Sequence, residues 1–236
     1  MHLTLEPDQL YVSVDVLIMT IREGRLSVLI SRRTQAPYQH CWALPGRLVA
    51  VDESAEVTAQ RLLSEMLCVR ETYLEQLFTF TAVGRDPRGR VISVAYLAVV
   101  PWPALEPLLT PENTSLRCFG IRQEGGVMTL EDADGTQLRG SDLAFDHGDM
   151  IAACVTRLQG KLDYTELGFR FLRDPQQFTL AELQGIYEAI WGRALDTSNF
   201  RRTILSRYEE SGRIGQTDQL LRQKKGRPAA IYRLKQ

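Results

Sequence analysis

The sequence lacks the features that mark several large classes of protein. Its first 14 residues hold no basic stretch followed by an apolar core, so no secretory signal is visible. The longest apolar stretch, Val94 to Trp102, is interrupted by Pro101 and is too short to span a bilayer. The four cysteines form no CxxC pair and show no metal-ligand spacing, which favours buried, reduced thiols. We therefore expect a cytoplasmic protein with no cofactor and no membrane partner.

Lysine is also missing from the first two thirds of the chain. Residues 1–156 hold 13 Arg and no Lys against 20 Asp and Glu, a net charge of −7, whereas the whole 236-residue chain carries only −1. Residues 157–236 hold 15 Lys and Arg against 9 Asp and Glu, a net charge of +6 that is concentrated after Asn199. A solvated surface gives no reason for charge to separate in this way. The pattern indicates two domains, 1–155 and 156–236, the second of which meets a polyanion.

The segment from Gly46 to Val69 carries the most informative motif, GRLVAVDESAEVTAQRLLSEMLCV. It resembles the Nudix box, G-x5-E-x7-R-E-U-x-E-E-x-G-U, in which U is a bulky apolar residue. The matching positions are Glu53, Arg61, Leu63, Glu65 and Val69. The differing positions are Arg47 and Cys68, which replace glycines, and Leu62 and Met66, which replace glutamates.

Three positions of this segment decide whether the site is catalytic. Positions 62, 65 and 66 share one face of a helix, and three carboxylates there could hold Mg²⁺ against a pyrophosphate. Here they are Leu62, Glu65 and Met66, and one carboxylate between two apolar side chains is a poor metal site. We therefore expect a pocket without hydrolytic activity and without a metal. The alternative is a Mg²⁺-dependent Nudix hydrolase of ADP-ribose or a related nucleoside diphosphate derivative.

The first domain is predicted to mix strands and helices. Tyr11–Thr20 and Leu26–Ser31 are rich in β-forming residues and flank the turn at Glu23–Gly24. Ser54 can cap a helix over Ala55–Leu67, which has a wide apolar stripe. The remaining predicted elements are strands at Leu74–Val83, Val91–Val100, Arg117–Arg122 and Val127–Leu138, with a turn at Asp134–Gly135 in the last, and a helix within Ser141–Gln159.

The second domain is predicted to be a helix-turn-helix with a wing. A first helix is expected over Arg157–Leu167. A capping box at Thr179–Glu182 opens a helix that runs to Trp191 and is closed by Gly192. The next helix is expected from an Asp196 cap through Tyr208, with Gly212 as its stop. Leu220–Arg222 and Ala229–Leu234 then form a hairpin around a basic turn.

Five segments, in order, resemble the Nudix-related transcriptional regulator (NrtR) family. They are WALPG (42–46), GRDPRGRVISVAYLA (84–98), LAFDH (143–147), SNFRRTI (198–204) and KKGRPAAIYRL (224–234). The resemblance implies an α+β chain: a Nudix-like α/β/α sandwich with a mixed sheet, followed by a winged helix-turn-helix domain. It also implies a homodimer held by the Nudix domains, which binds double-stranded DNA at a palindromic operator. The chain departs from the family at Arg47, where a second glycine is usual, and in the long segment Glu124–Gly140.

The same resemblance implies what the regulator senses and controls. The effector is expected to be ADP-ribose-like and linked to NAD metabolism, although some relatives sense sugars and control sugar-use genes. We expect a repressor in which the effector favours the arrangement that cannot bind DNA. The candidate effector-binding residues are Arg33, Trp42, Arg47, Glu65, Arg85 and Arg88. Arginine offers a planar fork of donors to phosphate or ribose, although a lone arginine is more often a surface residue and Trp42 could equally be core.

The DNA-binding candidates lie on the second predicted helix of the motif and on the wing. They are Ser198, Asn199, Arg201, Arg202, Arg207, Lys224, Lys225, Gly226, Arg227 and Tyr232. Arginine suits guanine and asparagine suits adenine, whereas the wing lysines are expected to grip phosphates. The alternatives are a solvated basic face and, for Tyr232, a place in the wing core. Phe200, Ile204 and Leu205 are expected in the core, and His147 is expected to be a structural hydrogen-bonding residue.

Overall fold

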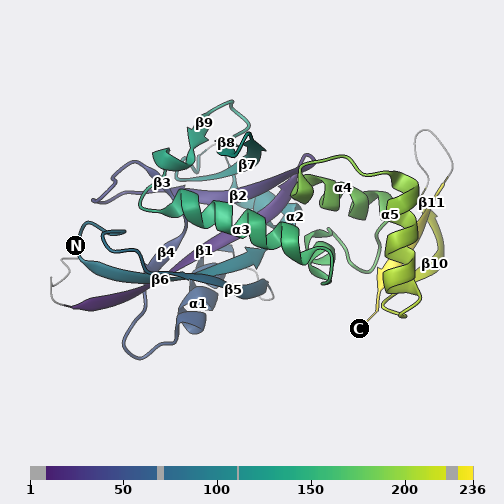
Figure 1. Cartoon of the computed structure of the whole chain (residues 1–236), viewed down its shortest axis with the longest axis horizontal. Helices are drawn as coiled ribbons and strands as arrows, with labels where there is room; N and C mark the ends of the chain where they lie inside the picture. Colours follow the sequence, from purple (N-terminus) through teal and green to yellow (C-terminus); the bar gives the residue numbers. More distant parts are fainter. Residues whose placement is uncertain (1–8, 68–71, 111, 222–227, 236) are drawn as a thin grey trace.

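The structure is a computed structural model that describes residues 9–67, 72–110, 112–221 and 228–235. A large sheet with helices on both sides forms one end of its long axis, and a small helical unit with a hairpin forms the other (Figure 1). The closing residues of the Nudix-like segment, Cys68 and Val69, lie outside the described residues, as do the wing-tip candidates Lys224, Lys225, Gly226 and Arg227.

The large sheet has nine strands and is mixed. Its main path is β5-β6-β1-β2-β7-β8-β9, with β3 paired to β2 and β4 paired to β1. Among the strands that the structure describes, β1 and β6 are the only pair that runs parallel, from the Leu10–Arg90 pair to the Met19–Val99 pair. The strands are β1 (Leu10–Arg22), β2 (Arg25–Arg32), β3 (Trp42–Ala43), β4 (Gly46–Leu48), β5 (Tyr73–Phe80), β6 (Arg90–Val99), β7 (Leu116–Glu124), β8 (Val127–Glu131) and β9 (Gln137–Arg139).

Both faces of this sheet are covered, because the side chains of β1 alternate between two cores. Val14, Val16 and Ile18 pack with α1 (Ala55–Leu67) and with the short α2 (Trp102–Leu105). Leu17 and Met19 belong to the opposite core, which includes α3 (His147–Lys161). The expected α/β/α sandwich with a mixed sheet is therefore confirmed, and α1 and α3 lie on opposite sides of it in Figure 1.

Helix α3 runs from the sandwich toward the second unit without a break at residue 156. The helix expected over Arg157–Leu167 is confirmed only as far as Lys161, where α3 ends, and a 3-10 turn over Leu167–Phe171 follows later. The core on the α3 side of the sheet continues through Leu158 and Leu162 to residues of the second unit. The two units therefore share one apolar core, and α3 belongs to both.

The second unit is a winged helix, as the sequence predicts. Its helices are α4 (Leu180–Trp191) and α5 (Thr197–Ile204), and its wing is β10 (Ile214–Leu221) paired antiparallel with β11 (Ala229–Leu234). Thr179 and Asp196 cap the two helices by accepting hydrogen bonds from the amides of Glu182 and Asn199. The α-helical part of the second helix ends at Ile204, and a π-helix over Leu205–Glu209 continues it, so the chain is helical through the expected Tyr208.

Two further strand predictions differ from the structure. The single strand expected over Val127–Leu138 is divided into β8 and β9, since the predicted turn at Asp134–Gly135 separates two pairing strands. Strand β10 begins at Ile214, six residues before the expected Leu220, because its polar stretch gave no strand pattern. Within the described residues, no helix combines the length and apolar character needed to cross a membrane.

Candidate functional site

A cavity of about 380 Å³ opens beside β1, β2 and β4, next to the turn between β5 and β6. Its lining also includes Phe145 and His147, at the start of α3. The charged residues that line it are Arg32, Arg33, Arg47, Arg85, Arg88, Asp15 and Asp86, with His147 beside them. Arginines outnumber carboxylates, so the cavity favours an anionic ligand.

Two arginines of this cavity lie against one aromatic ring. The guanidinium of Arg33 is 4.8 Å from the centre of the Phe145 ring, and that of Arg88 is 5.8 Å from it. Arg88 is paired with Asp86 through Nη2–Oδ2 at 2.7 Å and Nε–Oδ1 at 3.0 Å. Arg33 donates only to carbonyl oxygens in the described part of the chain, those of Pro37 and Gln35. Burial, and then the positive charge of Arg88, lower the pKa of Arg33. An anion would stabilise both charges here.

Arg85 is held in the floor of the cavity by two carboxylates. It donates to Asp146 through Nη2–Oδ1 at 2.6 Å and Nε–Oδ2 at 2.9 Å, and its Nη2 is 3.7 Å from Asp15 Oδ2. Burial raises the pKa of Asp15, but the hydrogen bonds of its partners, His147 foremost and then Ser93, together with the charge of Arg85, outweigh burial and lower it. The side chain of Arg85 is only 4% exposed. Although it lines the cavity, its Nε and Nη2 donors are engaged by the floor, and its role in effector binding stays a prediction.

His147 ties this floor to the loop before β4. Its Nδ1 accepts a hydrogen bond from the Leu44 amide at 2.9 Å, and its Nε2 is 3.5 Å from Asp15 Oδ1. The side chain is buried, so the expected structural hydrogen-bonding role is confirmed. Gly46 is required beside it: a Cβ there would lie 2.1 Å from Asp15 Oδ1 and 2.8 Å from the Val14 carbonyl oxygen.

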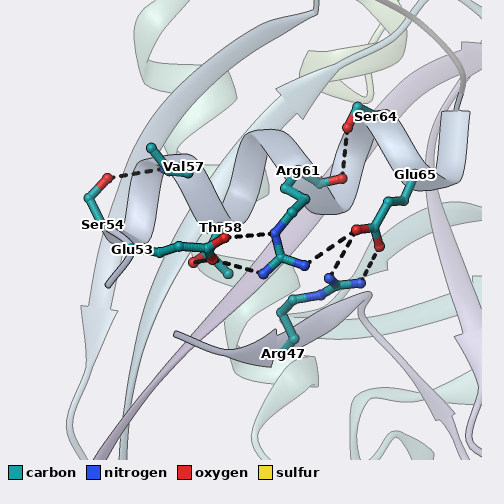
Figure 2. A network of polar contacts seen from close by, with 8 residues as sticks. All are labelled: Arg47, Glu53, Ser54, Val57, Thr58, Arg61, Ser64 and Glu65. Atoms are coloured by element: carbon teal, nitrogen blue, oxygen red, sulfur yellow. Dashed lines mark hydrogen bonds and ion pairs between the residues drawn. The ribbon is translucent and has the colours of Figure 1, made fainter. Parts of the chain in front are cut away.

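The Nudix-like segment forms a ladder of ion pairs instead of a cluster of free carboxylates (Figure 2). Arg61 donates to both oxygens of Glu53, at 2.9 and 2.8 Å, and to Glu65 at 3.3 Å. Arg47 donates to both oxygens of Glu65, at 3.3 and 2.6 Å. These hydrogen bonds lower the pKa of Glu65, chiefly through Arg47, and the pKa of Glu53, chiefly through Arg61.

The two replaced glutamate positions belong to the core rather than to the ladder. Leu62 is 5% exposed, and Met66 packs against the same core cluster. Glu65, by contrast, is about half exposed. Among the described residues, no group of three or more His, Cys, Asp or Glu side chains is placed to hold a metal ion.

The six effector candidates divide into two sets. Arg33, Arg47, Arg85 and Arg88 line the cavity, whereas Trp42 and Glu65 do not. Trp42 packs edge-on against Phe119, with ring centres 5.5 Å apart, at the border of the core on the α3 side of the sheet. The lining residues that sequence reasoning missed include the charged Asp15, Arg32 and Asp86 and the aromatic Phe145. The signals that could have identified them are an acid inside an apolar strand for Asp15 and the LAFDH segment for Phe145.

The exposed face of α5 carries most of the described DNA-binding candidates. Ser198, Asn199, Arg201 and Arg202 are all exposed, and Arg202 donates to Asn199 Oδ1 at 3.1 Å. The expected core residues of this helix are confirmed, since Phe200 and Ile204 are buried and Leu205 packs against them. Arg207 is half-buried over the Tyr208 ring.

Tyr232 lies in the wing core rather than on the surface. It is 1% exposed, packs against Phe178, and its hydroxyl is 3.5 Å from Arg201 Nη2. The expected direct contact of Tyr232 with DNA is therefore revised, because a buried ring cannot reach a phosphate. Its position instead links the wing to Arg201 on α5.

Comparisons with known proteins agree with this architecture. Residues 10–139 match the NUDIX domain family, and residues 168–234 match the NrtR DNA-binding winged helix domain. The chain is 35% identical over 223 residues to the ADPR responsive transcriptional repressor NtrR of Acinetobacter baylyi, covering 94% of this chain and 80% of that protein.

The chain belongs to the NrtR family.

Solved structures of similar proteins cover both units of this NrtR-family chain. The Shewanella oneidensis NrtR complexed with a 27mer DNA is 28% identical, with a TM-score of 0.74, and the match covers 95% of this chain and 93% of that one. A MutT/nudix family protein from Enterococcus faecalis is 27% identical, with a TM-score of 0.76 over 97% of this chain and 89% of that one. Residues 140–167, which hold α3, lie between the two matched family models.

Proposed function

We propose that this chain is a ligand-responsive transcriptional repressor of genes for NAD and ADP-ribose metabolism or for sugar use. The proposal rests on the exposed face of α5, which carries arginine and asparagine side chains and contacts the wing. A relative of this chain is named an ADPR responsive transcriptional repressor. Helices of this kind enter the major groove and read base edges. Binding to chromosomal DNA would place the protein in the cytoplasm of a bacterial cell.

We propose that the effector is ADP-ribose or a close analogue, bound in the arginine-lined cavity. A diphosphate is anionic and matches Arg33, Arg47 and Arg88, while ribose hydroxyls match the polar lining. The size of the cavity, about 380 Å³, lies within the range of small-molecule sites. A sugar without phosphate would leave this concentration of arginine unused, so the cavity favours the nucleotide over the sugar.

The active species is proposed to be a homodimer on a palindromic operator. Residues 1–155 would sense the effector and dimerise, and residues 156–236 would bind DNA. Two half-sites must align with the helical repeat of DNA, so a modest rotation of one winged helix against the other costs affinity.

Helix α3 is the proposed connection between the cavity and the winged helix. Its first residue, His147, lies in the cavity floor. Near its other end, Gln159 Nε2 donates to the Ile190 carbonyl at 3.0 Å, and the Gln159 carbonyl accepts from Trp191 Nε1 at 3.2 Å. An effector that moves Phe145 would shift this helix and therefore α4.

Hydrolysis is not part of the proposed function. Leu62 and Met66 are packed in the core, and Glu65 is paired with two arginines, so no described group of carboxylates could hold Mg²⁺ against a pyrophosphate. The alternative, an ADP-ribose hydrolase, would show Mg²⁺-dependent turnover that Glu65→Gln abolishes.

Fluorescence anisotropy on a duplex from the protein's own promoter region tests the proposal. We expect tight binding that weakens when ADP-ribose is added and does not weaken with an equal concentration of ribose. Absence of binding at both low and moderate salt would contradict the proposed role of the winged helix in DNA binding. Binding that pentoses, but not ADP-ribose, relieve would transfer the effector role to sugars.

A further inference from the structure

Arg47 places a permanent positive charge within the Nudix-like segment. It lies on β4, where its backbone pairs with Val14 of β1, and its side chain crosses to Glu65 on α1 (Figure 2). The two guanidinium nitrogens meet the two carboxylate oxygens at 3.3 and 2.6 Å. This fork-to-fork geometry fixes the orientation of the guanidinium plane as well as its position.

The residues present do not fit a divalent cation. Both oxygens of Glu65 are engaged by Arg47 or Arg61, and both oxygens of Glu53 are engaged by Arg61 or Thr58. A hard cation such as Mg²⁺ needs several oxygen ligands in a near-octahedral set. To bind here, it would have to displace two arginines and, within the described residues, still find only the two carboxylates of Glu53 and Glu65.

Arg47, whose guanidinium is paired with Glu65, is also one of the residues at the border of the ligand space. Arg47 lines the cavity together with Arg33 and Arg88, whereas Glu65 does not line it. Arginine has five N–H donors, and the bonds to Glu65 use one on each terminal nitrogen. Glu65 thus holds the group from the side of α1 and leaves the remaining donors for a ligand.

We propose that Arg47 replaces the divalent cation as the positive charge that meets the diphosphate of the effector, so that effector binding needs no metal. The inference rests on the proposed function, in which the effector is ADP-ribose or a close analogue. Glu65 is the positioning residue for Arg47. The arginine that replaces a glycine of the Nudix box then compensates for the loss of two of its glutamates. Those glutamates would have held a metal ion, and the arginine supplies the positive charge that the ion would have brought.

Calorimetric titration of ADP-ribose into the full-length protein tests this inference. For the wild type, we expect the same Kd in EDTA and in millimolar Mg²⁺, within twofold. Arg47→Gln should weaken binding about 10- to 100-fold in both buffers, since it removes charge-assisted hydrogen bonds. Arg47→Lys should recover part of the loss, because it restores the charge but not the fork. Glu65→Gln should weaken binding less than Arg47→Gln, and equally in both buffers.

The matched control is Arg122→Gln, which removes one positive charge from the exposed part of β7 outside the cavity. It should leave the Kd within twofold of the wild type, and thermal melts should show that every variant is folded. A wild-type Kd that rises tenfold or more in EDTA, or an Arg47→Gln variant that binds like Arg122→Gln, would overturn the inference and leave the proposed function standing. A wild type that binds no ADP-ribose in either buffer would instead overturn the proposed effector, and this inference with it.

Discussion

Arg85 and Arg33 both line the cavity, yet the guanidinium of Arg85 is held by Asp146 and Asp15, while that of Arg33 has no carboxylate partner among the described residues. The two arginines look alike in the sequence. Their difference depends on which carboxylates the fold brings beside them, and Asp146 is 61 residues from Arg85. The arginine content of the site could therefore be predicted from the sequence, whereas the division into structural and ligand-facing arginines could not.

At the DNA-binding face, Arg201→Ala should weaken operator binding by about 1–3 kcal/mol and relax sequence selection, if Arg201 reads a base. Fluorescence anisotropy with the operator and with single-base variants measures both effects. Arg213→Ala is the matched control, because Arg213 is an exposed arginine outside α5 that pairs with Glu166. Equal losses for the two variants would reduce the role of Arg201 to general charge.

At the wing, Lys224→Ala should weaken binding to every duplex alike and flatten the salt dependence, because a phosphate contact releases counterions. Lys224 lies outside the described residues, so this prediction rests on the basic sequence of the wing tip. The slope of log Kd against log salt measures it. A steeper slope, or a loss confined to one duplex, would contradict a phosphate-gripping role.

The floor of the cavity makes a prediction about pH. The folded-state pKa of Asp15 lies below its ordinary value of 3.8, so ionised Asp15 contributes stability that is complete above that value and is lost as the pH falls through the folded-state pKa. The gap in unfolding free energy between the wild type and Asp15→Asn should therefore be constant near neutral pH and shrink below about pH 4. Urea titrations from pH 7 to pH 3 measure it. The exposed Asp52→Asn variant is the control. If Asp15→Asn lowers the unfolding free energy at neutral pH no more than this control does, the role of Asp15 is refuted.

Among the helices and strands, α3 is the one whose length changes how the connection between the two units is understood. One face of this helix, with Met150, Ile151, Cys154, Val155 and Leu158, packs in the core beneath the sheet, and its last turn is bonded to α4. Sequence reasoning placed the domain boundary inside this helix, at residues 155 and 156, because its apolar stripe carries no signal for which unit it packs against. Elements with strong local signals were predicted well: Ser54, Thr179 and Asp196 all cap the expected helices. Elements whose formation depends on a partner, such as the polar half of β10, were not.

Breaking the α3–α4 contact should separate sensing from release. Gln159→Ala removes the hydrogen bond to the Ile190 carbonyl and should leave the Kd for ADP-ribose within twofold. The factor by which ADP-ribose weakens operator binding should fall about threefold or more, which is part of a typical coupling free energy of about 1–3 kcal/mol. Gln60→Ala, on the exposed side of α1, is the control. An unchanged factor in Gln159→Ala would exclude this contact from the coupling.

Across the whole molecule, net charge separates the two units, whereas apolar packing joins them. The acidic sandwich and the basic winged helix differ in net charge, which favours contact of DNA with only one end of the chain. Yet one apolar core joins them, so the winged helix is docked rather than tethered. The charge asymmetry could be predicted from the sequence because it depends on composition alone. The shared core could not, since it arises from long-range packing of strands, α3 and α4.

The central claim, that one chain couples a small anion at one end to DNA at the other, is tested most directly by linkage. The Kd for ADP-ribose is measured by calorimetry with the free protein and with the protein saturated by operator duplex, and the Kd for the duplex is measured with and without ADP-ribose. The account predicts that each ligand weakens the other by the same factor, about 5- to 150-fold. Equal ADP-ribose affinity in the presence and absence of operator would contradict it.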